Sequence, residues 1–318
     1  MAGGRTTRHP NILRSFICSS LLSLSACANA TDLCADAGGV ALQILGSGGP
    51  IADDGRASSA YIVWVDGASK VLVDAGGGAF LRFGEAGASF NELDHIAISH
   101  FHTDHSADLV TLLKSGYFSG RERPLGISGP GPGGPFPGVS GYLDSTIGTD
   151  GAYAYLSGYL DGTGGLVRLE ATAVDPAARN NTVVSGNSDS TIQIKATDVP
   201  HGIVPTIAYR VRVGEKVLVF ASDQNGNDET FVEFARDADV LVMHMVVPED
   251  VSGAGRNLHA PPSRIGQIAE AANARTLVLS HFMARSLQDF GSNIDLVRSE
   301  YHGDIVVAED LLCLPLAD

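Results

Sequence analysis

Residues 99–105 read Ser-His-Phe-His-Thr-Asp-His, which places three histidines and one aspartate within six residues. The apolar run Ile96–Ile98 leads into this stretch as a predicted strand, and residues 106–114 leave it as a predicted helix. Imidazole nitrogens and a carboxylate are the ligands that zinc and similar divalent ions prefer. The stretch therefore predicts a metal site at the end of a strand, with a chance cluster of surface histidines as the alternative.

The spacing inside this stretch predicts ligands for two ions. Because side chains alternate along an extended segment, His100 and His102 are expected to point to the same side. Asp104 and His105 follow the turn and can face a second ion.

Three later polar residues lie beside apolar runs and are candidates for the remaining ligands. Asp223 ends the run that begins at Val217, and His281 ends the run that begins at Thr276. His201 precedes the strand-like residues 206–213. Buried strands deliver side chains to one edge of a sheet, so these residues are expected to meet the first cluster. Alone, each would be read as a turn residue or a structural group.

With these motifs in place, the chain resembles the metallo-β-lactamase superfamily, and within it the ribonuclease Z-type and arylsulfatase-type hydrolases. The resemblance extends from about Val40 to Leu316 and includes Leu45–Gly49 and Val73–Gly76. It implies an α/β fold, the four-layer αββα sandwich of this superfamily. It also implies seven metal ligands, with Asp223 bridging both ions: His100, His102 and His201 for one ion, and Asp104, His105 and His281 for the other.

The same resemblance implies a binuclear metal-dependent hydrolase. Together with the missing arm, the acidic charge and the export signal described below, it leads us to expect an exported hydrolase of small-molecule phosphodiesters or sulfate esters. Two divalent ions, zinc by preference and manganese or iron as alternatives, would activate a water for attack, with Asp104 orienting it. Asp74 and Ser222 are candidate hydrogen-bond partners of the ligand histidines, or turn caps. One alternative activity is that of a lactonase or β-lactamase. A noncatalytic metal-binding module is the alternative from another class.

The sequence departs from the ribonuclease Z pattern in two places, one that protonates the leaving group and one that holds the substrate. Where that family has His-Glu-Ala-Thr, this chain reads His244-Met245-Val246-Val247, so the glutamate is missing. His259 remains as a candidate general acid, and Glu249 or Asp250 is a substitute partner only if their loop folds back. A long arm of the family is replaced by Gly214–Lys216, which predicts a tight hairpin turn.

The charge balance bears on the partner. The chain has 36 acidic and 21 basic residues and a formal net charge of −15. Such a charge repels polyanions, so a nucleic-acid partner is not expected and a small-molecule ester is. A homodimer is possible.

Residues 1–30 have the pattern of an export signal, because arginines precede a short apolar stretch and Ala28-Asn29-Ala30 fits a cleavage site. Leu24-Ser25-Ala26-Cys27 also resembles a lipoprotein box, which would attach a lipid at Cys27 and provide the only membrane contact. We therefore expect a periplasmic or secreted protein, or an outer-membrane lipoprotein. A single hydrolase domain is expected over residues 31–318.

Two further features leave alternatives open. Cys34 and Cys313 lie near opposite ends of the expected mature chain and can form a disulfide in an oxidising compartment, or stay as buried thiols. The Gly- and Pro-rich segment 116–175 contains a group of tyrosines that can form a wall of the substrate pocket or pack a short helix over residues 152–160. These are Tyr142, Tyr153, Tyr155 and Tyr159.

Overall fold

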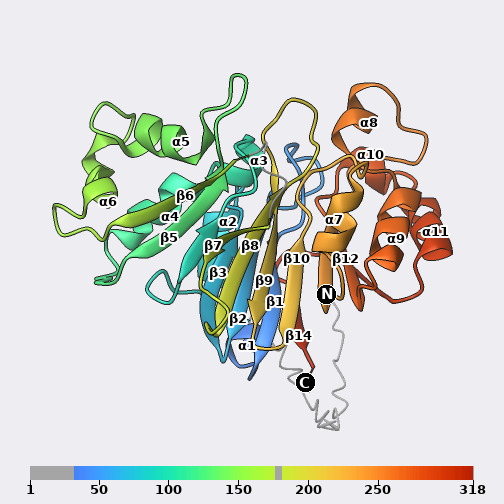
Figure 1. Ribbon diagram of the computed structural model, residues 1–318, viewed down its shortest axis with the longest axis horizontal. Helices are drawn as coiled ribbons and strands as arrows, with labels where there is room; N and C mark the ends of the chain where they lie inside the picture. The colour runs from blue at the N-terminus through green and yellow to red at the C-terminus, as the bar shows by residue number, and fades with distance from the viewer. Residues whose placement is uncertain (1–31, 176–180, 318) are drawn as a thin grey trace, which may run out of the picture.

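The computed structural model describes residues 32–175 and 181–317. Two seven-stranded mixed β-sheets pack face to face, and helices cover both outer faces (Figure 1). This is the four-layer αββα sandwich that the resemblance implied. The predicted export signal, with its candidate lipid-attachment residue Cys27, lies outside the described residues. Within the described residues, no helix has the length and apolar character needed to cross a membrane.

The first sheet has the strand order β14-β1-β2-β3-β4-β5-β6. Its first four strands are antiparallel, and β3 to β6 are parallel. The strands of this sheet are β1 (Val40–Gly46), β2 (Ala60–Val65), β3 (Ala68–Val73), β4 (His95–Ala97), β5 (Leu125–Pro130), β6 (Leu169–Val174) and β14 (Cys313–Leu316).

The second sheet has the order β13-β12-β11-β10-β9-β8-β7, with β7 to β10 antiparallel and β10 to β13 parallel. Its central strands β11 and β12 are apolar along nearly their whole length because both of their faces are covered. The strands of this sheet are β7 (Thr182–Ser185), β8 (Ile192–Asp198), β9 (Ile207–Val213), β10 (Lys216–Phe220), β11 (Val240–His244), β12 (Thr276–Ser280) and β13 (Asp304–Val307).

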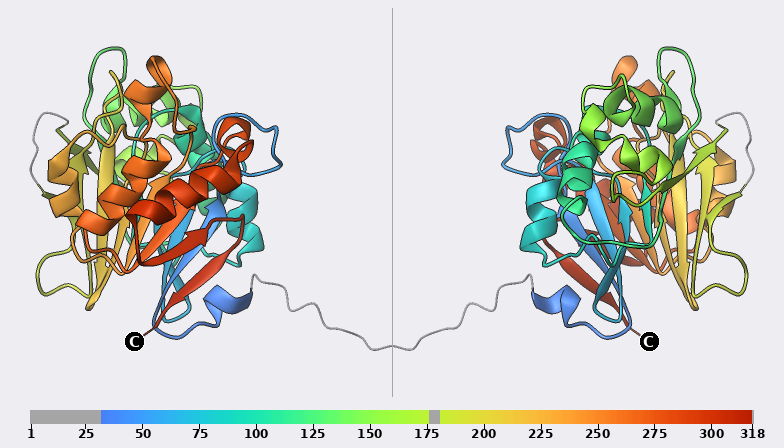
Figure 2. Two further views of the ribbon diagram at one scale, coloured as in Figure 1. Left: turned by 90° about the vertical axis from the view of Figure 1, so that its right-hand side faces the viewer. Right: turned by 90° about the vertical axis from the view of Figure 1, so that its left-hand side faces the viewer.

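The helices form the two outer layers, and Figure 2 shows one group on each flank. In α4, the buried Leu109, Leu112, Leu113 and Gly116 recur at helical spacing, so one face packs on the first sheet. The helices are α1 (Asp32–Ala35), α2 (Ala79–Glu85), α3 (Thr103–Ser106), α4 (Leu109–Gly116), α5 (Gly138–Ile147), η1 (a 3-10 turn, Ala154–Leu156), α6 (Gly158–Asp161), α7 (Glu229–Phe234), α8 (Ala254–Leu258), α9 (Pro262–Ala271), α10 (Ala284–Leu287) and α11 (Phe290–Glu300).

A tight hairpin joins β9 and β10, as the sequence predicted. Val213 pairs with Lys216, so only two residues turn the chain. The first of them, Gly214, has φ +57°, a conformation that glycine adopts without a steric penalty. No arm extends from this hairpin.

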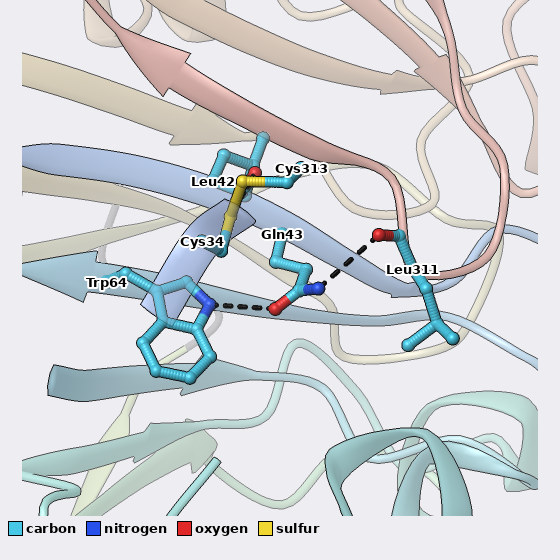
Figure 3. The surroundings of a disulfide bond; sticks show 6 residues. All are labelled: Cys34, Leu42, Gln43, Trp64, Leu311 and Cys313. Atoms are coloured by element: carbon cyan, nitrogen blue, oxygen red, sulfur yellow. Dashed lines mark hydrogen bonds between the residues drawn. A yellow bond between two sulfur atoms is a disulfide. The ribbon is translucent and has the colours of Figure 1, made fainter. Parts of the chain in front are cut away.

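A disulfide between Cys34 and Cys313 fastens α1 to β14 (Figure 3). The sequence had left this bond open. Next to it, the Trp64 indole donates a hydrogen bond to Gln43 Oε1 at 3.0 Å. The Gln43 amide in turn donates to the Leu311 carbonyl at 3.3 Å. Together these contacts tie both ends of the described chain to the first sheet.

Removing the disulfide should destabilise the fold substantially. The bond closes a loop of 279 residues. The entropy model gives an upper figure of about 5–6 kcal/mol for such a loop, and removal of native disulfides typically costs roughly 2–5 kcal/mol. We expect the Cys34→Ser/Cys313→Ser variant to melt about 5–15 °C below the wild type in thermal unfolding followed by circular dichroism. A reductant should lower the wild-type Tm by the same amount and leave the variant unchanged. Equal melting of oxidised wild type and variant would contradict this.

Candidate metal centre

All seven predicted ligands meet at one end of the two sheets. Each lies in a loop or short helix directly after a strand, which is why residues so far apart in sequence converge. All are buried except one that is half-buried. The ligands are His100 and His102 in the loop after β4, Asp104 and His105 in α3, His201 after β8, Asp223 after β10 and His281 after β12.

The first group of side chains contains His100, His102, His201 and Asp223, whose candidate ligand atoms all lie within 4.8 Å of one another. His100 Nε2 is 3.0 Å from His102 Nδ1, and His201 Nε2 is 3.6 Å from Asp223 Oδ2. Three imidazoles and one carboxylate are a donor set suited to zinc.

A second group shares Asp223 and adds His105, His244 and His281, again within 4.8 Å. Asp104 lies beside this group, with its Oδ2 at 3.2 Å from His281 Nε2 and 3.7 Å from His105 Nε2. The predicted second set is therefore together in space. The sequence had not assigned His244 to this site.

The nitrogen positions fit a metal ion better than they fit direct hydrogen bonds. His201 Nδ1 donates to the Leu258 carbonyl at 2.9 Å, and its other ring nitrogen, Nε2, is buried with no hydrogen-bond partner. His105 Nε2 and His281 Nε2 face each other at 3.0 Å. Two imidazole nitrogens that bind one tetrahedral zinc lie about 3.3 Å apart.

The electrostatics also favour a cation. Burial opposes ionisation of Asp223, but the surrounding histidines, His281 first among them, hold the pKa of this carboxyl well below its usual value. Burial likewise opposes ionisation of Asp104, yet His281 lowers its pKa to about 2. Burial opposes a charge on His105, but carboxylates led by Asp74 raise its pKa to about 9. The negative charge of these carboxylates stabilises a proton on His105, and it would stabilise a divalent cation bound at the same place in the same way.

Asp74 orients one ligand histidine, in line with its predicted role. Its Oδ2 lies 2.8 Å from His105 Nδ1, and its Oδ1 accepts a hydrogen bond from the Ser99 amide at 2.7 Å. Asp74, Ser222 and His281 all have φ +57°, in the left-handed region. Such backbone strain clusters at functional sites. Ser222 forms no hydrogen bond through its Oγ, so its predicted partner role is not seen.

His244 holds the shared carboxylate from the other side. Burial lowers the pKa of His244 to about 4, so its ring is neutral. Because ionised Asp223 has no proton to give, His244 Nδ1 donates to Asp223 Oδ1 at 2.7 Å. His244 Nε2 lies 3.2 Å from the hydroxyl of Tyr61 on β2, and that hydroxyl donates a hydrogen bond to Ser280 Oγ at 3.0 Å. Tyr61 and His244 together fix the orientation of Asp223.

We expect Tyr61→Phe to weaken metal binding by about tenfold, because outer hydrogen-bond partners set ligand orientation. Competition with a chromogenic chelator measures the affinity. The matched control is Tyr301→Phe, since Tyr301 is also a buried tyrosine but its hydroxyl donates to the Ala274 carbonyl, far from the ligands. Unchanged affinity in Tyr61→Phe, or an equal loss in the control, would contradict this role.

The candidate general acid lies at the centre without the glutamate partner of ribonuclease Z. His259 Nδ1 is 4.0 Å from Asp223 Oδ2 and has no hydrogen-bond partner. Met245 is fully buried in the core. Glu249 does not substitute, because it accepts hydrogen bonds from the Ser263 amide and hydroxyl at the start of α9.

A cavity of about 480 Å³ opens onto the ligands. It combines apolar walls with one arginine, Arg285, whose side chain is exposed and whose Nε donates to the Val246 carbonyl at 3.1 Å. The residues that line it are Pro50, Phe101, His102, Thr103, Asp104, His201, Asp223, Leu258, His259, His281, Met283 and Arg285.

The four tyrosines singled out in the sequence do not line this cavity. Tyr159 packs in the core, as the helix alternative required, and donates to the Leu113 carbonyl at 2.8 Å. The expected helix over residues 152–160 is divided into η1 and α6. Tyr153 and Tyr155 are exposed instead, so the pocket-wall interpretation is wrong for this cavity.

A family model described as "Beta-lactamase superfamily domain" matches residues 69–282, more than half of the chain. The chain belongs to the β-lactamase superfamily. All seven converging side chains lie within the matched residues. This member of the superfamily is a metal-dependent hydrolase, as the sequence predicted, and its histidine–aspartate cluster suits a divalent ion such as zinc.

Relatives and solved structures agree with this assignment. The ribonuclease Z of Methanosarcina mazei is 26% identical over 294 residues, which cover 84% of this chain and 95% of that protein. The ribonuclease Z of Mycobacterium bovis is 27% identical, covering 85% and 96%. Human tRNase Z, short form, superposes with a TM-score of 0.67 at 19% identity, covering 87% of this chain and 100% of that chain. The metallo-β-lactamase fold protein YhfI from Bacillus subtilis has a TM-score of 0.64 at 20% identity, covering 86% and 98%.

These relatives contradict one prediction. A small-molecule ester was expected and a nucleic-acid partner was not, but the curated relatives are ribonucleases by name. The expectation was wrong because the net charge of −15 sums the whole surface and says nothing of the local field at one cleft. The missing arm removes one means of holding a polymer and does not alter the centre. The possible homodimer stays a prediction.

Proposed function

We propose that this protein is a phosphodiesterase of ribonuclease Z type that hydrolyses phosphodiester bonds in RNA. The observation that carries the proposal is the convergence of two ligand groups on one shared carboxylate, Asp223. Relatives named ribonuclease Z, aligned over 84–85% of the chain, support RNA as the polymer.

We further propose that the centre holds two zinc ions. The first group offers three imidazoles and Asp223. The second offers His105, His281 and Asp223, with Asp104 beside it, while His244 is held by its hydrogen bond to Asp223. Nitrogen-rich sets of this kind suit zinc better than magnesium or calcium, which prefer oxygen. Divalent ions in these positions would supply Lewis-acid activation of water and of a phosphoryl oxygen.

The protein's own side chains then have distinct tasks. Asp104 is ionised, because its pKa is about 2, and its carboxylate accepts a hydrogen bond from the attacking water and orients it. The Arg285 guanidinium at the cavity wall binds a phosphate oxygen, a task that its planar fork of donors suits. His259 also lines the cavity and donates a proton to the leaving oxygen.

We propose that the protein works outside the cytoplasm, in the periplasm or as a secreted protein. The Cys34–Cys313 disulfide supports an oxidising compartment, and the signal-like pattern of residues 1–30 supports export. Fractionation of cells that express the full chain tests this. Recovery only in the cytoplasmic fraction, with both thiols reduced, would refute it.

Cleavage of a labelled RNA hairpin with an unpaired 3′ extension tests the activity. We expect chelator-sensitive cleavage that returns when zinc or manganese is added. Parallel assays with p-nitrophenyl sulfate and nitrocefin cover the sulfatase and β-lactamase activities of related folds. Chelator-sensitive turnover of either of these, with no cleavage of RNA, would contradict the proposal.

A further inference from the structure

A cluster of exposed aromatic residues follows the end of α4 and lies in and beside η1, on the side of the molecule where Figure 1 draws α4, α5 and α6. We call it the aromatic platform. Large apolar side chains rarely gather on a surface without a partner. The members of the platform, with their exposed fractions, are Tyr117 (42%), Phe118 (74%), Tyr153 (45%) and Tyr155 (59%).

A lysine at the end of α4 lies among three of these rings. Lys114 Nζ is 4.4 Å from the ring centroid of Tyr117, 4.6 Å from that of Phe118 and 4.9 Å from that of Tyr155. Cation–π attraction holds the ammonium there. The platform thus presents aromatic faces together with one positive charge.

The platform is connected to the metal centre through the packing of α5. Phe101 lines the cavity and stacks on Tyr142 with ring centroids 4.6 Å apart. Thr146, one turn further along α5, donates its hydroxyl to the Tyr142 carbonyl at 2.7 Å. The Tyr153 amide donates to the Thr146 carbonyl at 2.7 Å. A chain of contacts through Tyr142 and Thr146 therefore runs from the cavity wall to Tyr153 at the platform.

We propose that the aromatic platform binds unpaired nucleotides of the RNA substrate on the side of the scissile bond that leaves the metal cavity. This inference rests on the proposed function. Exposed rings stack on bases with little regard for sequence, and a single lysine neutralises one phosphate. Such a surface holds a polymer without a basic arm, and it functions on an acidic protein because stacking does not depend on charge.

The proposal predicts weak salt dependence. A platform with one lysine, assisted by Arg285 in the cavity, engages two phosphates. The logarithm of the affinity for single-stranded RNA should then fall with the logarithm of salt concentration with a slope of about −1.4. Proteins that hold nucleic acid through a basic arm have steeper slopes.

The decisive comparison uses two substrates and the Phe118→Ala/Tyr155→Ala variant of the metal-loaded protein. For an RNA with a 12-nucleotide unpaired extension, we expect KM to rise roughly 10–100-fold with kcat unchanged, since each stacked base contributes measurably. Hydrolysis of bis-p-nitrophenyl phosphate, which is too small to reach the platform, should stay at the wild-type rate.

Two control variants make the comparison specific. Phe118→Tyr retains an aromatic face and should retain wild-type KM for RNA. Phe80→Ala removes a partly exposed aromatic residue from α2, outside the platform. It should change neither the KM for RNA nor the rate of hydrolysis of bis-p-nitrophenyl phosphate.

Three outcomes would overturn the proposal. They are an unchanged KM for RNA in the double variant, an equal loss on both substrates, and self-association of the wild type through the platform that the double variant abolishes. If the wild type does not cleave RNA, the proposed function fails. The dissociation constant of fluorescent single-stranded RNA, compared between wild type and double variant, then still tests the platform.

Discussion

Replacing Asp223 with asparagine should lower RNA hydrolysis by at least about 10³-fold and remove at least one ion from the centre. Asp223 is the carboxylate that both ligand groups share. Its Oδ2 lies 3.6 Å from His201 Nε2, and its Oδ1 lies 3.4 Å from His281 Nε2. An amide of the same shape carries no negative charge, so it cannot balance a cation on either side.

The rate of RNA cleavage and the metal content of the same preparation measure both effects. Asp94→Asn is the matched control. Asp94 also pairs with basic side chains, Lys70 and Arg123. It directly precedes β4, whereas the ligand histidines follow the other end of that strand. The control should retain wild-type rate and metal content. Two ions per chain in Asp223→Asn would remove this residue from the centre.

Replacing His259 with alanine should slow RNA cleavage by roughly 10²–10³-fold while leaving nitrophenyl phosphodiesters within about threefold of wild type. Burial lowers the pKa of His259 to about 3, so the free protein holds a neutral ring at physiological pH. A phosphodiester anion bound beside the ring raises that pKa and favours the protonated form. Protonation matters for an RNA leaving oxygen, which is a poor leaving group, and matters little for nitrophenolate.

The ratio of the two rates, measured on one preparation of each variant, isolates this effect. His302→Ala serves as the control, because His302 is an exposed histidine paired with Glu270 on the surface. Equal losses on both substrates in His259→Ala would show that the residue supports the centre structurally and donates no proton.

The converging side chains could be predicted from the sequence because most of them come after an apolar run. His201 is the exception, because it follows the mixed polar and apolar strand β8. The carboxyl ends of parallel strands meet at one edge of a sheet, so residues such as Asp223 and His281 approach the histidine cluster whatever the intervening chain does. The resemblance to a known superfamily then supplied the grouping of the ligands. The αββα architecture was likewise what the resemblance implied.

The support around the ligands could not be predicted in the same way. His244 ends a buried strand and resembled a structural residue, because only the pairing of β10 with β11 brings it to Asp223. Tyr61 comes from the other sheet, and no local pattern links it to His244. Side-chain contacts across the interface between the sheets depend on how the sheets pack, which periodicity does not specify.

The tyrosines of the irregular segment show a similar limit. The composition singled out Tyr153, Tyr155 and Tyr159 as residues of a pocket wall or of a packed helix. It could not tell which of them is buried in the core and which are exposed on the surface. Tyr159 is buried, whereas Tyr155 lies against Lys114 on the surface. The expectation against nucleic acid, drawn from the net charge, the missing arm and the export signal, was wrong because charge distribution and aromatic exposure are properties of the folded surface.

Anomalous diffraction at the zinc edge, from crystals of the metal-loaded protein, tests the central claim most directly. The account predicts two peaks about 3.5–4 Å apart on either side of Asp223, one against His100, His102 and His201 and the other against His105 and His281. A single peak, or density that leaves His201 or His281 uncoordinated, would contradict it.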